Sequence, residues 1–502
     1  MARKRKDILL LADPSRSRIA ADLDVLYPDR VERIDYSKQR LTSALLAPYR
    51  CVITQVAHGV LLPKLNYRAL TACARRGGQV LSCLFEYAEN RGLRLSKTHV
   101  LDGEPPAMRI EAECDVTRGY AVGDRIGWFG CVERTADLRY ENQMFQRQLF
   151  GVRESKDVRI LAVSTVNHGA VMVEEKVGKG RIVALDMLSP GRPTFNSHGS
   201  TNKYVFLANM LGTGVRYGRH YPKRLSYGEF ADAMADLARN HPALTLRNEG
   251  PCSDGRPIWS LGLGDEANPT LYVGASIHGW EWENAYGVLR LAELLAEQPD
   301  VEGLDTGRLH FQFVPIQNPW GHEHFTRQNS RGVDLNRNFA NAWDELPEVQ
   351  DVPTPWDYNY KGARAGSERE TQVLQRILDR CRPLCVIDFH TADYGLLPAD
   401  GVDQGFMDAI HANIKGRLKD RFLCQKPSFG PFQQVNMDYI EGKSSPMPYL
   451  VSYASKGGAA VAFVVEMSGN RDGMHAILMN TETVVEICLA ATEECLRRIA
   501  KG

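Results

Sequence analysis

Short apolar runs and stretches of helical spacing alternate along the first part of the chain. Residues 67–76 carry apolar side chains at the three- and four-residue spacing of an amphipathic helix. Strands that alternate with helices are typical of a mostly parallel sheet covered by helices. The pattern therefore predicts an α/β domain over residues 1–215. The apolar runs that we interpret as its buried strands are residues 8–12, 51–56, 79–85, 159–164 and 181–188.

The pattern changes after residues 212–225, which are rich in glycine and basic side chains and lack either periodicity. Such a segment predicts a linker between domains. Directly after it, Ser226 and Glu229 have the spacing of a capping box, which marks the start of a helix. Strand and helix patterns then continue, and they predict one large α/β domain over residues 225–502. Its strands are expected at 271–277, 309–316, 384–389 and 459–465, and helices at 284–297 and 482–499.

Length and composition support this division and exclude some classes of partner. A chain of 502 residues is too long to fold around one ordinary hydrophobic core. Its content of 43% hydrophobic residues excludes a largely disordered protein. The 61 basic and 61 acidic side chains cancel, so no net charge attracts nucleic acid or an anionic membrane. No apolar stretch approaches the ~20 residues that a membrane span needs. We therefore expect neither nucleic acid nor membrane as a partner.

The 11 cysteines are scattered along the chain and include no CxxC pair. Cys381 and Cys385 lie four positions apart, but no second pair of zinc-finger spacing accompanies them. Reduced and mostly buried thiols are usual in cytosolic proteins, whereas disulfides belong to oxidising compartments. Cysteine usage thus predicts a cytoplasmic location.

The first domain resembles flavodoxin-like and glutamine-amidotransferase-like α/β domains. An active amidotransferase would need a cysteine on a tight, glycine-flanked turn after a strand. Cys83 follows a predicted strand, but its neighbours are Ser82 and Leu84 instead of glycines. His168 could be its base, yet no acidic residue follows two positions later, as that family's motif requires. We therefore predict that residues 1–215 are non-catalytic.

Residues able to hold a metal follow two predicted strands of the second domain. His278 and Glu281 come directly after 271–277, and His390 ends the run 384–389. Two imidazoles and a carboxylate leave one position of a tetrahedral zinc ion open for water, as in hydrolytic sites. A His-x-x-Glu pair is also expected by chance, and a lone strand-end histidine is more often a hydrogen-bonded loop residue.

A further carboxylate, Glu466, ends the apolar run Phe463-Val-Val-Glu466. Burying a charge there is costly unless the strand end faces a polar site, so Glu466 is a candidate general base. The alternative is a glutamate that faces solvent. A polar segment, residues 318–339, contains arginines and asparagines that can bind a carboxylate, although alone it would predict an ordinary surface loop.

The candidate residues belong to a series of short motifs whose order along the chain resembles that of the zinc metallocarboxypeptidase family typified by carboxypeptidase A. The resemblance covers about residues 225–502 and implies a mixed-sheet catalytic domain, preceded here by the smaller flavodoxin-like one. The motifs that carry it are His278-Gly-Trp-Glu281, Asn318-Pro319, Thr326-Arg327, Gly332-Val-Asp-Leu-Asn-Arg-Asn-Phe339, His390-Thr391 and Phe463-Val-Val-Glu466.

The resemblance implies a role for each matching residue. His278, Glu281 and His390 would bind one zinc ion per chain. Asp334 would accept a hydrogen bond from the ring of His278 and so fix its tautomer. Glu466 would be the general base.

Substrate contacts follow from the same resemblance. Asn336 and Arg337 would hold the free carboxylate of the substrate. Arg327 would stabilise the oxyanion, with Arg331 as a nearby competitor for that role. A tyrosine should close over the substrate, and Tyr439 is the first candidate.

Tyr449 and Tyr453 are alternatives for that tyrosine, and residues 442–455 should line the side-chain pocket. His322 and His324 fall in a variable part of the family's loop, so we interpret both as structural.

These observations predict a zinc metallocarboxypeptidase that acts on a peptide or peptide-like substrate with a free carboxylate. One alternative keeps the zinc site in an amidase or deacylase for N-acyl amino acids, cell-wall peptides or isopeptide-linked glutamate. Another is an inactive binding protein on the same fold. The sequence gives no oligomeric state and no side-chain specificity.

Overall fold

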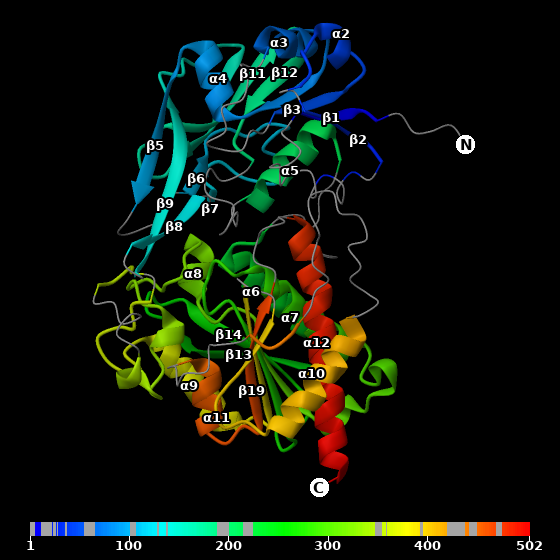
Figure 1. Cartoon of the computed structure of the whole chain (residues 1–502), viewed down its shortest axis with the longest axis vertical. Helices are drawn as coiled ribbons and strands as arrows, with labels where there is room; N and C mark the ends of the chain where they lie inside the picture. The colour runs from blue at the N-terminus through cyan, green and yellow to red at the C-terminus, as the bar shows by residue number, and fades with distance from the viewer. Residues whose placement is uncertain are drawn as a thin grey trace.

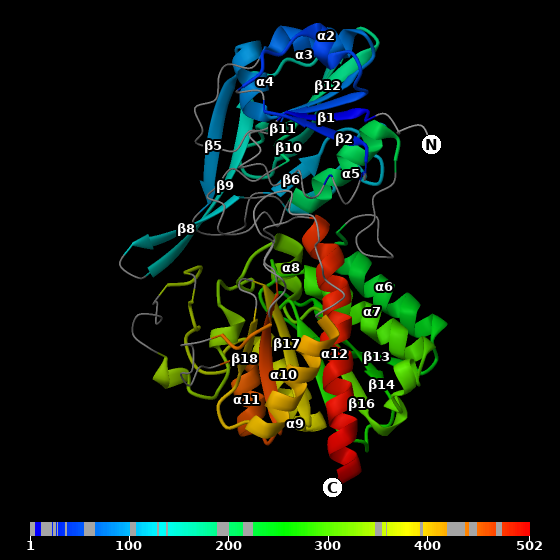
Figure 2. The ribbon, with the colours of Figure 1, turned by 45° about the vertical axis from the view of Figure 1, so that its right-hand side comes forward.

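The computed structural model (Figures 1 and 2) shows two α/β parts, one above the other, each with its own sheet. The second part contains the long C-terminal helix. The residues that the structure describes are 6–11, 23, 27, 29–35, 38–54, 66–100, 107–127, 130–136, 139–187, 200–213, 224–346, 354–357, 359–391, 395–418, 437–440, 449–467 and 474–501.

The first sheet has a parallel half. The strands β1 (Ile8–Leu11) and β3 (Cys51–Thr54) are buried at each position, which requires cover on both faces. One face packs against α3 (Tyr67–Arg75) and the other against α5 (Ser200–Leu211). The other parallel strands are β2 (Val31–Ile34), β4 (Gln79–Ser82) and β12 (Gly180–Ala184), in the order β2-β1-β3-β4-β12.

The other half of this sheet is antiparallel, so the expectation of a mostly parallel sheet is only half met. In β6 (Ala107–Ile110) buried and half-buried positions alternate, and such a strand lacks the continuous apolar run that marks a parallel one. The remaining strands are β5 (Arg94–Val100), β7 (Arg125–Gly127), β8 (Gly130–Ala136), β9 (Arg139–Phe150), β10 (Val158–Ser164) and β11 (Ala170–Val177). Two short helices, α2 (Ser43–Leu46) and α4 (Leu84–Arg91), complete the described part of this domain.

The second part is built on a mixed sheet, as predicted. Its core strands β16 (His310–Val314), β15 (Thr270–Ala275), β17 (Cys385–Thr391) and β19 (Val461–Met467) are parallel neighbours in that order. Antiparallel strands flank them: β13 (Leu244–Pro251) and β14 (Pro257–Leu263) on one side and β18 (Gly395–Pro398) on the other.

Helices cover both faces of this sheet. On one face lie α7 (Glu283–Glu297), α10 (Gln404–Leu418) and α12 (Met474–Lys501), which pack with apolar residues such as Val273 and Phe463. On the other lie α9 (Arg369–Cys381) and α11 (Leu450–Lys456). The remaining helices are α6 (Tyr227–Asn240), whose capping box is formed as predicted, the short α8 (Pro319–His324) and the single-turn η1 (Val301–Gly303), η2 (Thr306–Arg308), η3 (Leu335–Arg337) and η4 (Trp343–Glu345).

The strand β19 points toward the first domain (Figure 1), and the strands parallel to it share this direction. Their carboxyl ends, where ligands bind in open α/β sheets, therefore face that domain. Most of the predicted linker, residues 214–223, lies outside the described residues. Among the helices of the described chain, none combines the length and the apolar character that crossing a membrane requires.

Candidate metal centre

The two segments that carry the proposed metal ligands leave neighbouring parallel strands at the same edge of the second sheet. His278 and Glu281 lie in the loop between β15 and α7, and His390 is the sixth residue of β17. The loop is held by backbone hydrogen bonds from Trp280 N to Thr326 O (3.0 Å) and from Glu281 N to His278 O (2.9 Å). Gly279 permits this close approach, because a Cβ at that position would collide with the backbone of α8.

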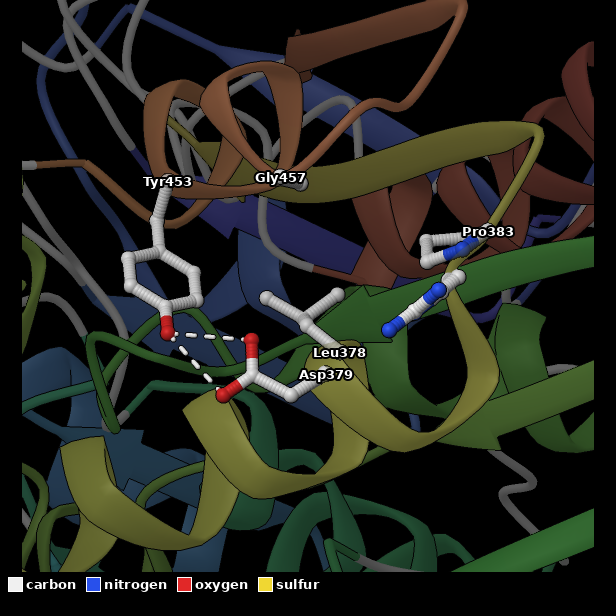
Figure 3. Close-up of a pocket in the computed structure, with 7 residues that line it drawn as sticks. Leu378, Asp379, Pro383, Tyr453 and Gly457 are labelled. Atoms are coloured by element: carbon white, nitrogen blue, oxygen red, sulfur yellow. Dashed lines mark hydrogen bonds between the residues drawn. The ribbon is translucent and has the colours of Figure 1, made fainter.

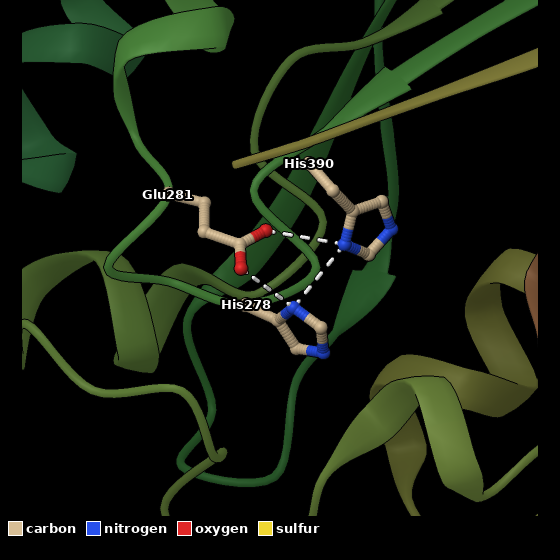
Figure 4. A group of neighbouring side chains, drawn as sticks. All are labelled: His278, Glu281 and His390. Carbon is tan, nitrogen blue, oxygen red and sulfur yellow. Dashed lines mark hydrogen bonds and ion pairs between the residues drawn. The ribbon is translucent and has the colours of Figure 1, made fainter. Parts of the chain in front are cut away.

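The three side chains point toward one another (Figure 4), and in the described part of the chain they form a group that could hold a metal ion. The Nδ1 atoms of His278 and His390 are 3.2 Å apart. Glu281 places Oε1 3.0 Å from Nδ1 of His278 and Oε2 3.1 Å from Nδ1 of His390. All three residues are buried.

This triangle of donors fits zinc. A tetrahedral ion with ligands at about 2.0–2.1 Å has donor atoms separated by roughly 3.4 Å. Two imidazole nitrogens and one carboxylate oxygen are also the donor set of catalytic zinc sites, which keep the fourth position open. Burial acts to raise the pKa of Glu281, but the two histidines outweigh it and hold that pKa well below its usual range. Glu281 is therefore ionised and able to bind a cation.

Each histidine contacts a buried carboxylate through its other ring nitrogen. Nε2 of His278 is 3.2 Å from Oδ1 of Asp334, as the resemblance implies, and Nε2 of His390 is 2.9 Å from Oδ2 of Asp388. Burial would raise the pKa of Asp334, but Arg327, His278 and Arg337 keep it well below its usual range.

Sequence reasoning missed Asp388. The signal was present, because Asp388 is a charged residue inside an apolar run and lies two positions before His390. Side chains two apart on a strand share one face of the sheet.

Glu466 lies beside His390 on the adjacent strand. The two residues are direct partners in the parallel register of β17 and β19. Neighbouring strands are about 4.8 Å apart, and paired residues project from the same face. Glu466 is half-buried, and its Oε2 atom is shielded from solvent. The proposed general base therefore stands at the same edge as the metal ligands.

The sequence offers two arginines for the oxyanion contact, Arg327 and Arg331. Arg327 is buried, and its Nη1 lies 3.2 Å from Nδ1 of His278, the nitrogen that faces the metal position. Its guanidinium is oriented by Asp334, with Nε and Nη2 at 2.9 and 2.7 Å from Oδ2. The side chain of Arg331 is 59% exposed and lies 3.7 Å from Glu368. The geometry thus favours Arg327.

Asn336 and Arg337 lie between the metal ligands and α11. Nδ2 of Asn336 is 3.5 Å from Nε2 of His390, while its Oδ1 accepts a hydrogen bond from Leu450 N (3.0 Å). Arg337 donates from Nη1 to the backbone oxygen of Asn336 (3.1 Å). Its Nε is buried and has no hydrogen-bond partner among the described residues. A buried donor in this state suits an anionic ligand such as a carboxylate.

The structure separates the three candidate tyrosines. The hydroxyl of Tyr439 donates to Asp408 on α10 (2.9 Å), which directs it to the edge of the domain. The ring of Tyr449 lies 4.7 Å below the guanidinium of Arg337. Of the three, Tyr449 is thus the one that touches a proposed substrate-binding residue, and the geometry favours it over Tyr439. Of the expected pocket segment, residues 442–448 lie outside the described residues.

Tyr453 belongs to a different place in the fold. Its hydroxyl donates to Asp379 (3.0 Å), and the two residues line a small cavity of about 280 Å³ (Figure 3). Leu378 and Pro383, at the end of α9 and the start of β17, form part of the same lining. The cavity therefore lies at the opposite end of β17 from His390.

His322 and His324 make contacts that hold the α8 segment. Nε2 of His322 lies 3.2 Å from the backbone oxygen of Leu225, and Nδ1 of His324 lies 2.9 Å from that of Trp320. Burial keeps the pKa of His322 well below its usual range. Neither histidine is among the three residues of the metal-binding group.

Cys83 in the first domain lacks the geometry of a nucleophile. It has φ −71° and ψ 156°, an extended conformation, whereas a nucleophile elbow is a sharp, strained turn. Burial raises the pKa of its thiol well above the usual range. His168 is exposed, in the turn between β10 and β11. These features agree with a non-catalytic first domain, which stays a prediction.

Comparison with known proteins identifies the second domain. Residues 230–471 match the zinc carboxypeptidase family. This part of the chain belongs to that family. The predicted resemblance is thereby confirmed over residues 230–471. Zinc is the metal of this family, and the group formed by His278, Glu281 and His390 could hold it.

Several relatives are similar to parts of the chain. Human mast cell carboxypeptidase A is 24% identical over 183 residues, which are 32% of this chain and 43% of that protein. Murein peptide amidase A of Escherichia coli K12 is 37% identical over 83 residues, 14% of this chain and 32% of that protein. The crystal structure of carboxypeptidase A from Helicoverpa armigera has a TM-score of 0.47 and 19% identity, over 55% of this chain and 74% of that one. The chain spans less than half the length of the curated relatives it matches.

Proposed function

We propose that this chain is a zinc-dependent metallocarboxypeptidase that hydrolyses the C-terminal peptide or amide bond of a substrate with a free carboxylate. The observation that carries this proposal is the triangle of donors from His278, Glu281 and His390, 3.0–3.2 Å apart, at the same sheet edge as Glu466. The family match over residues 230–471 supports it.

Each nearby side chain has a task in this reaction. A zinc ion held by His278, Glu281 and His390 would act as a Lewis acid toward water and toward the scissile carbonyl. Glu466 accepts the proton of the attacking water as a general base, and later delivers it to the departing amine as a general acid. Arg327 donates to the oxygen on which negative charge develops. A single preorganised donor of this kind is worth roughly 10²–10³ in rate.

The substrate carboxylate is held by Asn336 and Arg337. Nδ2 of Asn336 and the buried Nε of Arg337 are both donors, and the guanidinium adds a positive charge that fits a carboxylate. This pair would make the enzyme act at a chain end, because an internal peptide bond offers no carboxylate there.

A second candidate is a zinc amidase that acts on peptides of another kind, such as cell-wall peptides. The match to murein peptide amidase A favours this candidate. That relative is 37% identical over 83 residues, whereas human mast cell carboxypeptidase A is 24% identical over 183 residues. The metal group and the base would serve both reactions, so the two differ only in the substrate pocket. An inactive binding protein fits less well, because each predicted zinc ligand and Glu466 stand at one edge of the sheet.

The test combines metal content with two substrates. Purified protein should contain about one zinc ion per chain and hydrolyse an acyl-dipeptide with a free carboxylate. The same compound with an amidated C-terminus should react far more slowly. Equal rates on both compounds would contradict the roles of Asn336 and Arg337, and turnover of a cell-wall peptide alone would select the amidase. A chain that binds no zinc would refute the proposal.

We also propose a reducing, cytosolic location. It is supported by nine cysteines that are free in the described part of the chain, most of them buried. Titration of thiols in protein isolated under non-reducing conditions and then unfolded should find all 11 cysteines of the sequence reduced. Disulfides in that sample would overturn this proposal.

A further inference from the structure

Asp388 occupies an unusual place for a charged residue. It lies in the middle of β17, is 0% exposed, and has apolar neighbours on the strand. Burying a carboxylate is costly unless hydrogen bonds or an opposite charge compensate it. Its Oδ2 faces Nε2 of His390 at 2.9 Å, and its Oδ1 accepts a hydrogen bond from Nε2 of Gln317 at 3.1 Å.

Gln317 reaches Asp388 across an intervening strand. Gln317 follows β16, Asp388 is on β17, and Gly274 of β15 lies between them as the direct partner of Asp388. A Cβ on Gly274 would collide with the amide of Gln317, so the missing side chain makes room for the hydrogen bond. Gln317 also lies 3.3 Å from the hydroxyl of Tyr272. The carboxylate is thus held through both of its oxygens, by His390 at Oδ2 and by Gln317 at Oδ1.

Asp388 and Asp334 differ in the charged groups that surround them. Asp334 has Arg327 as a counter-ion at 2.7 Å. Asp388 has no lysine or arginine in ion-pair contact among the described residues, and its ionic partner is His390. With Asp334 paired to Arg327, Asp388 and the ligand Glu281 are the carboxylates beside His390 that can balance a bound cation.

We infer that Asp388, held by Gln317 through the gap at Gly274, is a positioning residue that fixes the ring of His390 and increases the affinity of the site for zinc. Nε2 of His390 donates its proton to Asp388, which leaves the lone pair of Nδ1 directed at the metal position. Nδ1 is the atom that lies 3.2 Å from Nδ1 of His278 and 3.1 Å from Glu281. Carboxylates that orient a ligating histidine in this way raise its basicity.

The experiment measures the zinc dissociation constant by competition with a chelator. It uses the full-length chain and the variants Asp388→Asn, Asp388→Leu and Gln317→Leu. Asn keeps the shape and loses the charge, whereas Leu removes the acceptor as well. Affinity should fall in the order parent, Asn, Leu, and the Leu variant should bind zinc about 10–100-fold more weakly than the parent. Gln317→Leu leaves Asp388 in place and should weaken binding less than Asp388→Leu.

The matched control is Asp236→Asn, which makes the same chemical change on the exposed face of α6. It should bind zinc like the parent. A purely structural role for Asp388 would leave the affinity of correctly folded variants unchanged, so equal constants for parent and Asp388→Leu would overturn the inference. If Asp388→Leu does not fold, equal constants for parent, Asp388→Asn and Gln317→Leu overturn it in the same way.

The inference rests on the proposed zinc site, and the two can fail separately. A parent protein that binds no zinc refutes the proposed function itself. A parent that binds zinc and hydrolyses the peptide, together with Asp388 variants of unchanged zinc affinity, refutes only the role of Asp388. Zinc release into excess chelator gives a second readout, and it should be faster in Asp388→Asn than in the parent.

Discussion

The two domains both place polar side chains where parallel strands end, yet the two places differ in what those side chains contact. In the first domain, Asp186 caps α4 by accepting a hydrogen bond from Leu84 N (2.9 Å) and lies 3.6 Å from Arg147. Nearby, Thr54 donates to Glu86 at 2.6 Å. These groups interact with one another and fill the helix N-terminus that an incoming anion would use.

In the second domain, the groups at the strand ends converge on one point. Three donors meet at His278, Glu281 and His390, and a buried nitrogen of Arg337 has no hydrogen-bond partner within the described chain. The comparison teaches that polar residues at strand ends do not by themselves make a site. A metal site is marked by several donor atoms that converge on one point, as those of His278, Glu281 and His390 do.

The largest expected effect is on peptide hydrolysis, and it distinguishes the metal centre of the second domain from the strand ends of the first. Glu466→Gln should retain zinc and lose peptide hydrolysis by about 10²–10⁴-fold, since it removes a general base. Cys83→Ser should leave kcat/KM unchanged, because the buried thiol of the first domain has no role in the reaction. Steady-state rates and metal analysis of both variants check this. A Glu466→Gln enzyme as active as the parent would remove the proposed mechanism.

The next effect concerns Glu86 and the stability of the first domain. Burial raises the pKa of Glu86 to about 7. A carboxyl whose pKa is higher folded than unfolded favours folding below the unfolded pKa, and this contribution is lost as pH rises through the folded pKa. Between pH 5 and pH 8 the parent should therefore lose stability on the order of 3 kcal/mol relative to Glu86→Gln.

Urea unfolding of both proteins at pH 5 and pH 8 measures that difference. Glu89→Gln, an exposed change on the same helix, is the control and should follow the parent. The explanation by burial would be wrong if parent and Glu86→Gln responded to pH alike.

A somewhat smaller effect is expected when Arg337, whose buried Nε is a hydrogen-bond donor, is replaced. Arg337→Met keeps most of the side-chain volume and removes the charge, so kcat/KM for a free-carboxylate substrate should fall about 10–100-fold, the value of a hydrogen bond between charged groups. The rate on the amidated substrate should change little. Arg331→Met, on the exposed arginine of the same segment, should match the parent on both substrates. Equal losses on both substrates for Arg337→Met would mean that Arg337 supports the fold instead.

The smallest effect concerns packing behind His390. Gly274→Ala should destabilise the protein by about 1–3 kcal/mol, because its Cβ collides with Gln317. In a Gln317→Ala background the same change should cost less, since the colliding amide is gone. A double-mutant cycle of unfolding free energies measures this coupling. Additive effects would show that the two residues do not compete for the same space.

Much of this architecture followed from local sequence patterns. Buried parallel strands such as β1 and β19 are mostly apolar runs, and the capping box of Ser226 and Glu229 marked the start of α6. The metal ligands could be named because each stands at or just beyond the end of such a run. Of the antiparallel strands of the first domain, β10 was predicted and the others were missed; half-buried strands such as β6 carry a weaker signal.

What the sequence determined by itself was the α/β class of both domains and the approximate positions of the strongest strands, because these depend on residues close together in the chain. The candidate zinc ligands followed from the motifs that the chain shares with a known family. Only the tertiary structure decided that Asp388 backs His390, that Gln317 reaches it over Gly274, and that Tyr449 lies against Arg337. These contacts join residues from separate strands and loops. Their geometry depends on strand register and on which side chains are small enough to let others pass, and no local pattern encodes either.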